Sequence, residues 1–200
     1  MVNRLNNYEY LTMRYIPLIV IIFLSPITMF SQYETQKFDS VSSFDGIEIR
    51  YYPPSMMIKY DGDKNSNRGF GSLFRYISGS NDLNQKISMT TPVHMQKNNS
   101  NSSMEFVLPS NFTPDSAPKP SNSSLQLYQS TSQHYAVIKY GGYTNSEKEN
   151  KFSKELISKL NLNSIEIIGD PKVLVYDSPY KFINRTNEII IPINYKQYFD

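Results

Sequence analysis

Aromatic residues in the segment 66–77 recur at helical spacing and could form a surface for a ligand. Phe70, Leu73, Phe74 and Ile77 fall at positions i, i+3, i+4 and i+7, so they share one face of a predicted helix. A ligand resting on this helix would contact aromatic surface. The alternative is that both phenylalanines belong to the core, as apolar side chains at helical spacing usually do.

Basic residues stand close to aromatic ones in two places. Arg68 and Arg75 flank the phenylalanines of the predicted helix, and Lys181 lies between Tyr180 and Phe182. Cations at the edge of an apolar surface could take part in binding an amphipathic ligand. The alternative is that these cations are ordinary solvated charges.

Signatures of the common enzyme classes are missing from the sequence. There is no Gly-x-Ser-x-Gly elbow, no phosphate-binding loop, no His-Glu-x-x-His and no cysteine. The two histidines, His94 and His134, are predicted to be surface or hairpin residues, and two are too few for a dedicated metal site. We therefore predict a binding protein and not an enzyme, with a hydrolase-like activity as the remaining enzyme hypothesis.

Composition points to one β-rich domain. The 200 residues include 16 Tyr, 11 Phe and no Trp, and suffice for a single full core. Lys and Arg number 20 against 18 Asp and Glu, a net charge of +2 with no basic block. Nucleic acid is therefore not an expected partner.

The first 31 residues have the pattern of a secretory signal peptide. Arg14 precedes a short apolar run over 15–24, and small residues follow near the predicted cleavage site. We predict that residues 1–31 are removed, that the protein is secreted or periplasmic, and that the mature chain has no membrane span. The alternative is an uncleaved anchor, but the run is broken by Pro17 and Pro26 and is shorter than the ~20 apolar residues of a spanning helix.

Two halves with the same order of elements follow a flexible lead-in over 32–44. Strands are predicted where apolar and polar residues alternate, and helices where apolar residues recur every three or four positions. The first half comprises strands 47–52 and 56–60, helix 66–77, and strands 86–95 and 104–108. The second comprises strands 125–128 and 135–140, a helix capped by Ser146 and Glu149 with Phe152, Leu156, Ile157 and Leu160 on its apolar face, and strands 172–176 and 188–193.

The repeat predicts the architecture. Ile58-Lys59-Tyr60 before the first helix corresponds to Ile138-Lys139-Tyr140 before the second. A unit this long favours a pseudo-twofold domain over an open array. We predict an α+β fold, a distorted antiparallel β-barrel of about eight strands flanked by two helices, closed so that no strand edge is exposed.

Several ordered motifs resemble those of the SOUL haem-binding protein family. They are Ile-Glu-Ile-Arg-Tyr-Tyr (47–52), Phe-Arg-Tyr-Ile-Ser-Gly-Ser-Asn-Asp (74–82) with Lys-Ile-Ser-Met-Thr-Thr-Pro-Val (86–93), Val-Ile-Lys-Tyr-Gly-Gly-Tyr (137–143) and Ser-Pro-Tyr-Lys-Phe-Ile-Asn-Arg-Thr-Asn-Glu (178–188). The resemblance implies the barrel with two helices, and one such domain is expected over 45–196.

The resemblance also implies a binding site for haem or a related tetrapyrrole. Its platform would be the first helix with Phe70 and Phe74, where well-known members carry methionine. Arg75 and Lys181 would pair with the carboxylates, and Arg68 lies beside the position of a third cation in the family.

Tyr51 is the implied candidate for an axial iron ligand. It matches a position where some members carry histidine, and a deprotonated tyrosine can bind ferric iron. The alternative is a strand tyrosine that packs with Tyr52. We therefore expect a carrier, buffer or scavenger that holds haem or porphyrin by apolar burial and carboxylate pairing. The second hypothesis is a module of the same fold for another amphipathic small ligand or a protein partner.

Overall fold

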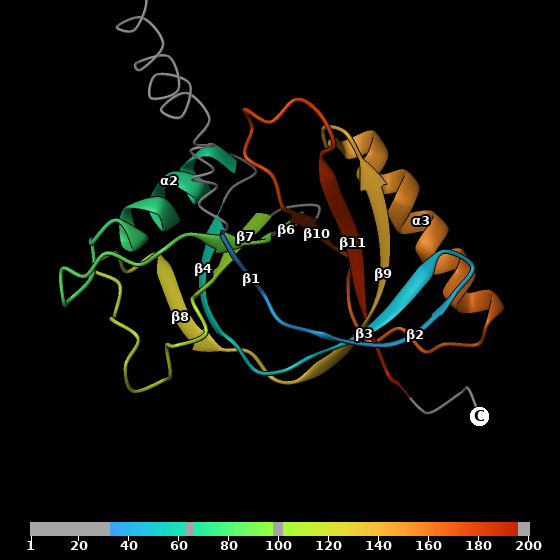
Figure 1. Ribbon diagram of the computed structural model, residues 1–200, viewed down its shortest axis with the longest axis horizontal. Coiled ribbons are helices and arrows are strands. Elements are labelled where there is room, and N and C mark those ends of the chain that lie inside the picture. Colours follow the sequence, from blue (N-terminus) through green and yellow to red (C-terminus); the bar gives the residue numbers. More distant parts are fainter. Residues whose placement is uncertain (1–32, 63–65, 98–101, 196–200) are drawn as a thin grey trace, which may run out of the picture. The chain divides into compact units, whose positions relative to one another are not determined.

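One nine-stranded antiparallel sheet carries most of the chain (Figure 1). The computed structural model describes residues 33–62, 66–97 and 102–195. The predicted signal peptide therefore lies outside the described residues and stays a prediction. The strands are β2 (Asp39–Phe44), β3 (Ile47–Tyr52), β4 (Met56–Gly62), β6 (Val93–Lys97), β7 (Ser102–Val107), β8 (Leu125–Gln129), β9 (Gln133–Gly141), β10 (Lys172–Val175) and β11 (Thr186–Ile193).

The described chain contains two helices and one short strand pair outside the sheet. The helices are α2 (Ser66–Ile77) and α3 (Ser146–Leu162). The pair is β1 (Glu34–Thr35) beside β5 (Thr90–Thr91), which run parallel. Residues 33–200 form a compact unit, and every core cluster of the described chain lies within it. We therefore expect this unit to fold by itself.

Strand order confirms the internal repeat. The sheet runs β2-β3-β9-β11-β10-β6-β7-β4-β8. If β3 is exchanged with β8, β4 with β9, β6 with β10 and β7 with β11, the last eight strands have the same order when the sheet is followed from its other edge. The pseudo-twofold axis therefore passes between β6 and β10, which pair antiparallel.

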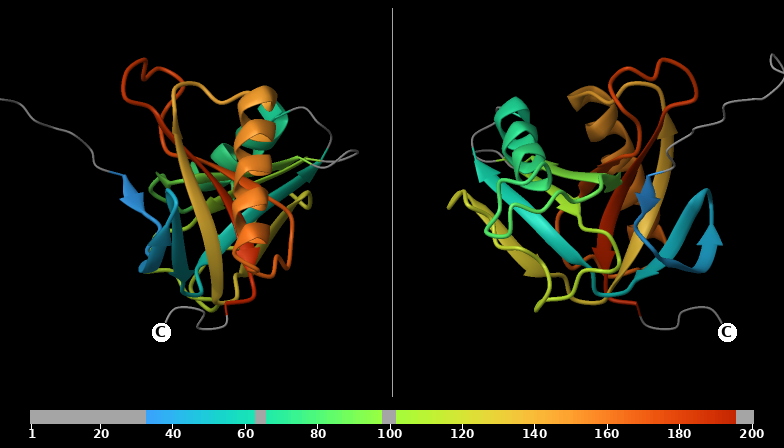
Figure 2. Two further views of the ribbon diagram at one scale, coloured as in Figure 1. Left: turned by 90° about the vertical axis from the view of Figure 1, so that its right-hand side faces the viewer. Right: turned by 60° about the vertical axis from the view of Figure 1, so that its left-hand side comes forward.

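The predicted α+β fold with a distorted antiparallel barrel and two helices is confirmed, but the sheet curls without closing (Figure 2). Strands β2 and β8 are its two edges, so the expected closure is wrong. The sheet has nine strands because residues 39–44, predicted to be part of a flexible lead-in, form β2. The turn at Asp45 and Gly46, both with positive φ, folds β2 back onto β3.

Helix α2 forms as predicted, but its apolar residues face two ways. Leu73 and Ile77 are buried against β4 and β7, whereas Phe70 and Phe74 are 43% and 50% exposed. Gly79, with φ of +114°, ends the helix, because the N–H groups of the residue itself and of the next one donate back to the last turn.

Two local predictions are corrected. The strand expected over 86–95 begins only at Thr90, and it is divided at Pro92, which has no N–H to donate. The N-cap of α3 is Asn145, whose Oδ1 accepts from the N–H of Lys148 at 2.9 Å, and not Ser146. Glu149, predicted to cap this helix together with Ser146, is instead buried and accepts from Lys97 at 3.0 Å.

The two faces of the sheet are covered differently. Both helices pack on one face, over separate apolar clusters. The opposite face carries buried charged groups, and the segment 36–38 lies over part of it. The ring of Phe38 lies 4.0 Å from the guanidinium carbon of Arg50, and the side chain of Gln36 hydrogen-bonds His94 Nε2 at 2.8 Å.

Arg50 is the centre of the larger charged cluster. Its two terminal nitrogens donate to both oxygens of Glu188 at 2.8 and 2.9 Å, and one also reaches Glu48 at 2.7 Å. The hydrogen bond from Arg50 is the main reason why the pKa of Glu48 falls to about 2. The cluster ties β3 to β11 across β9.

His94 is buried on the same face, so the prediction of a surface histidine is wrong. Burial lowers its pKa to about 4, although nearby Glu105 acts in the opposite direction and Lys172 in the same one. The sequence gives no sign of this, because the packing that removes water comes from distant strands.

The Arg50 cluster predicts a large stability cost for removing one partner. Glu188→Gln should lower the free energy of unfolding by about 3–5 kcal/mol, because it leaves a buried guanidinium without its bidentate acceptor. Urea denaturation measures this. Lys59→Ala is the control, since it breaks the pair of the half-buried Lys59 with the exposed Asp61 and should cost under about 1 kcal/mol. Equal losses would contradict the role of the cluster.

The burial of His94 leads us to expect that the free energy of unfolding falls in acid. In the unfolded chain its pKa is near 6.5, and in the folded chain it is about 4. The unfolded state therefore takes up a proton first, and stability falls as pH drops from 6.5 towards 4. Between pH 7 and pH 5 this group should cost about 2 kcal/mol, measured by urea denaturation at both pH values. In His94→Gln that component of the loss should vanish, and an unchanged pH dependence would refute the assignment.

Candidate functional site

An apolar cavity of about 560 Å³ lies beside α2, on the helix-bearing side of the sheet. It is bordered by α2, by the strands β6 and β10 near the pseudo-twofold axis, and by the loop that follows β10. Its size is within the range of small-molecule sites. Its lining residues are Tyr33, Phe70, Gly71, Phe74, Met89, Thr91, Val93, Met95, Met104, Val175, Tyr176, Asp177, Ser178, Pro179 and Arg185. We call this space the apolar cavity.

Helix α2 presents a stacked aromatic pair to the cavity. The rings of Phe70 and Phe74 lie nearly parallel with centroids 6.0 Å apart, and Phe106 supports Phe70 edge-on at 5.5 Å. Gly71 lies between them, and a Cβ there would meet no atom within 4 Å. The helix surface beside the rings is therefore open, and neither phenylalanine is sealed in the core.

Three methionines make the floor of the cavity adaptable. Met89, Met95 and Met104 come from the segment before β5, from β6 and from β7. Their unbranched thioether chains fill irregular spaces and contact aromatic rings favourably. The cavity can therefore adjust to a flat ligand.

Arg185 is the cation of the lining, and sequence reasoning missed it. Its guanidinium donates to the carbonyls of Ser178, Lys181 and Asp177 at 2.6, 2.8 and 3.3 Å, and lies 4.3 Å from the ring centroid of Tyr143. Its Nε is buried and has no hydrogen-bond partner among the described residues. The sequence could have pointed to Arg185 by its position four residues after Lys181, within the motif over 178–188.

The three predicted cations lie outside the lining of the cavity. Arg68 and Arg75 are exposed on α2, where Arg75 donates to Ser72 Oγ at 3.3 Å. Lys181 donates to Asp177 at 2.6 Å. Their roles in carboxylate pairing stay predictions.

Asp177 is held charged by the loop. Its partial burial acts to raise its pKa, but hydrogen bonds from Lys181 and from the N–H of Thr186 outweigh this and leave the pKa below its ordinary value. The ionised carboxylate therefore links the start of the loop to Lys181 and to Thr186 at the loop's other end.

Tyr51 lies away from the cavity. It is half-buried on β3, and its ring centroid is 5.1 Å from that of His134. His134 in turn stacks on Tyr195 at 4.6 Å. The structure thus brings Phe70 and Phe74 together but not Tyr51 with them. No group of three or more His, Cys, Asp or Glu residues suited to a metal ion occurs in the described part of the chain.

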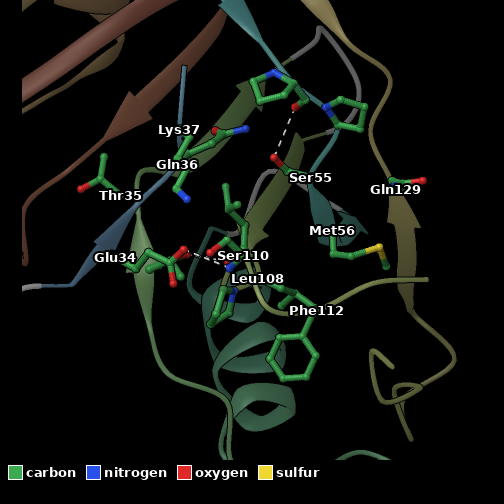
Figure 3. A pocket seen from close by; sticks show the side chains of 15 residues that line it. Glu34, Thr35, Gln36, Lys37, Ser55, Met56, Leu108, Ser110, Phe112 and Gln129 are labelled. Carbon is green, nitrogen blue, oxygen red and sulfur yellow. Dashed lines mark hydrogen bonds between the residues drawn. The ribbon is translucent and has the colours of Figure 1, made fainter. Parts of the chain in front are cut away.

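Two other hollows are less suited to a flat apolar ligand. One, of about 120 Å³, lies where the segment 34–37 meets Pro53–Met56 (Figure 3). There the Glu34 carboxylate accepts from the backbone N–H of Ser110 at 3.0 Å. The other, of about 550 Å³, lies beside α3 and is lined by polar groups that include the buried Glu149 and its exposed partner Lys97.

None of the helices in the described ranges has the length and apolar character needed to cross a membrane.

Comparisons with known proteins agree with this geometry. The model of the SOUL heme-binding protein family matches residues 33–192. Heme-binding protein 2 of Mus musculus is 27% identical over 158 residues, which cover 71% of this chain and 75% of the mouse protein. Its Homo sapiens counterpart is 28% identical over 156 residues, with the same shares.

Solved structures show the same fold at low identity. The C-terminal domain of EcmrR has a TM-score of 0.56 at 10% identity, covering 74% of this chain and 96% of that domain. A hydrolase from Listeria innocua has a TM-score of 0.51 at 9% identity, covering 82% of this chain and 95% of that one. These similarities concern the fold alone. With the family model matched over residues 33–192, the chain belongs to the SOUL heme-binding protein family.

Proposed function

We propose that the protein binds haem or a related tetrapyrrole in the apolar cavity and serves as a non-enzymatic carrier, buffer or scavenger. The observation that carries this proposal is the open aromatic pair of Phe70 and Phe74 facing three methionines in a cavity of about 560 Å³. Family membership supports haem as the cofactor.

The lining fits a flat macrocycle with carboxylates at its rim. Phe70 and Phe74 would stack against the ring and the methionines would pack on its edge, while the open surface at Gly71 leaves room. Arg185 brings a positive charge to the lining that can pair with a carboxylate. When bound, haem supplies an iron centre, and the protein's part is to bury the ring and exclude water.

Axial ligation is weak or absent in this proposal. Tyr51 lies outside the cavity lining, and the hydroxyl of Tyr176 donates to Glu188 at 2.7 Å. Burial and the nearby Glu188 carboxylate raise the pKa of Tyr176, so it stays protonated. The lining also contains no histidine. That observation favours the second candidate, another planar amphipathic ligand in the same cavity.

A binding role without catalysis agrees with the state of the two histidines. His94 is buried and uncharged, with a pKa of about 4, and the ring of His134 stacks on Tyr195 and lies tilted against Tyr51. Neither lines the apolar cavity. The name of the Listeria hydrolase concerns that protein, and similarity in fold does not carry activity.

We also propose that the protein works outside the cytoplasm. The support is the sequence pattern of residues 1–31, with an N-terminal membrane anchor as the alternative. Fractionation of the producing cells followed by N-terminal sequencing tests it. A chain recovered outside the cytoplasm that starts near residue 32 agrees with the proposal, and an intact N-terminus in the cytoplasm contradicts it.

The aromatic pair predicts a loss of affinity on truncation. Phe74→Ala should weaken ferric haem binding about tenfold, because it removes half of the stacking surface. Soret-band titration of residues 33–200 measures this. Leu162→Ala is the control, since Leu162 is 81% exposed at the end of α3 and should leave affinity unchanged. Absence of any saturable Soret change in the unaltered protein would refute haem binding, and a non-tetrapyrrole ligand retained through purification would favour the second candidate.

A comparison of haem with its dimethyl ester identifies the cation that meets the carboxylates. The ester should bind the unaltered protein about tenfold more weakly, because it cannot form a charge-assisted hydrogen bond. In Arg185→Gln the two ligands should bind alike. Arg75→Gln and Lys181→Gln test the family-implied cations in the same titration. If Arg185→Gln still prefers haem over its ester, and Arg75→Gln or Lys181→Gln does not, the carboxylates pair with Arg75 or Lys181 and not with Arg185.

A further inference from the structure

The loop 177–185 carries three large apolar side chains into solvent. Tyr180, Phe182 and Ile183 are 83%, 78% and 75% exposed. Single exposed apolar residues are common on protein surfaces, but three within four residues form a local patch that needs an explanation. The loop joins β10 to β11 and projects beyond the end of the sheet, as the orange-red segment at the top of Figure 1 and in both views of Figure 2. We call these three residues the apolar tip.

The base of the loop is braced, so the tip is held outward. Arg185 binds three carbonyls of the loop, and Asp177 accepts from both Lys181 and the N–H of Thr186 at 2.6 Å. The hydroxyl of Tyr143 adds a bond to the Pro179 carbonyl at 3.2 Å. A loop with this many internal bonds cannot fold its apolar side chains back onto the sheet without breaking several of them.

We propose that the apolar tip docks the protein on the surface of a lipid bilayer by inserting between headgroups. Tyr180 and Lys181 are the residue types that place an apolar body in the interface and a polar end in water, and Phe182 and Ile183 supply the apolar anchor. Because Lys181 already pairs with Asp177, the tip adds little net charge. Binding should therefore depend on apolar insertion and not on anionic lipid.

The size of the tip favours a bilayer over a protein partner. The three side chains together expose on the order of 450 Å². Each side of a stable protein interface contributes about 800 Å² and offers a matched surface. A fluid bilayer accepts a small convex tip without a complementary pocket, so this area is used fully there.

The tip stands at the rim of the apolar cavity. Ser178 and Pro179 line the cavity, and Tyr180 follows them directly. Docking would place the cavity mouth at the membrane interface, where an apolar macrocycle can pass between bilayer and protein with little exposure to water. This last step rests on the proposed function, whereas docking itself does not.

Vesicle binding of residues 33–200 without ligand tests the docking. This segment excludes the apolar run of the N-terminus, which would bind membranes by itself. Because the chain contains no cysteine, Ile183→Cys can carry a single environment-sensitive fluorophore, with Leu162→Cys, equally exposed at the far end of α3, as the matched control. Phosphatidylcholine vesicles should shift the dye at position 183 to the blue and leave that at position 162 unchanged.

Sedimentation of the unlabelled protein with the same vesicles completes the test. The triple variant Tyr180→Ser, Phe182→Ser, Ile183→Ser should lose binding at least tenfold, while its circular dichroism and Soret titration report an intact fold and cavity. Equal sedimentation of the variant, or binding only to phosphatidylglycerol-containing vesicles that salt abolishes, would overturn the proposal. Self-association of the protein that the triple substitution removes would assign the tip to a second copy. Failed haem binding with normal sedimentation would refute only the proposed function.

Discussion

Both faces of the sheet carry buried side chains, so other parts of the chain must shield each face from water. One face is covered by α2 and α3 over apolar clusters. The other is covered partly by the segment 36–38, and there the sheet carries buried ion pairs. Arg50 is the centre of that second face, because Glu188, Glu48 and the hydroxyl of Tyr52 accept from its terminal nitrogens and Phe38 covers its plane. A buried guanidinium with fewer acceptors would cost more than the packing around it gains.

The helix-bearing face is where the two repeats diverge. Each helix borders a hollow of similar volume, about 560 Å³ beside α2 and 550 Å³ beside α3, and Met95 lines both. Phe70 and Phe74 make the first hollow apolar, whereas Glu149 and its ion pair make the second polar. The pseudo-twofold architecture therefore places a hollow beside each helix, and side-chain chemistry makes the one beside α2 apolar.

The loop 177–185 lines the apolar cavity at its base and extends into solvent at its tip. Arg185 holds it by contacts to the loop's own carbonyls and to Tyr143, so one residue both lines the cavity and fixes the loop. The same bracing presents the apolar tip. The proposed ligand binding and the proposed docking therefore both depend on the polar contacts that hold this one short loop.

The sequence by itself determined the repeat, the helices and the aromatic pair, because those depend on local periodicity that the chain expresses wherever it packs. Phe70 and Phe74 could be identified in this way, but whether they faced the core or a cavity depended on how α2 lies on β4 and β7. Only the tertiary structure decided that Arg185 enters the site, that Tyr51 stays outside it, and that His94 and Glu149 are buried. Burial and charge pairing arise between strands far apart in the sequence, so no local pattern records them.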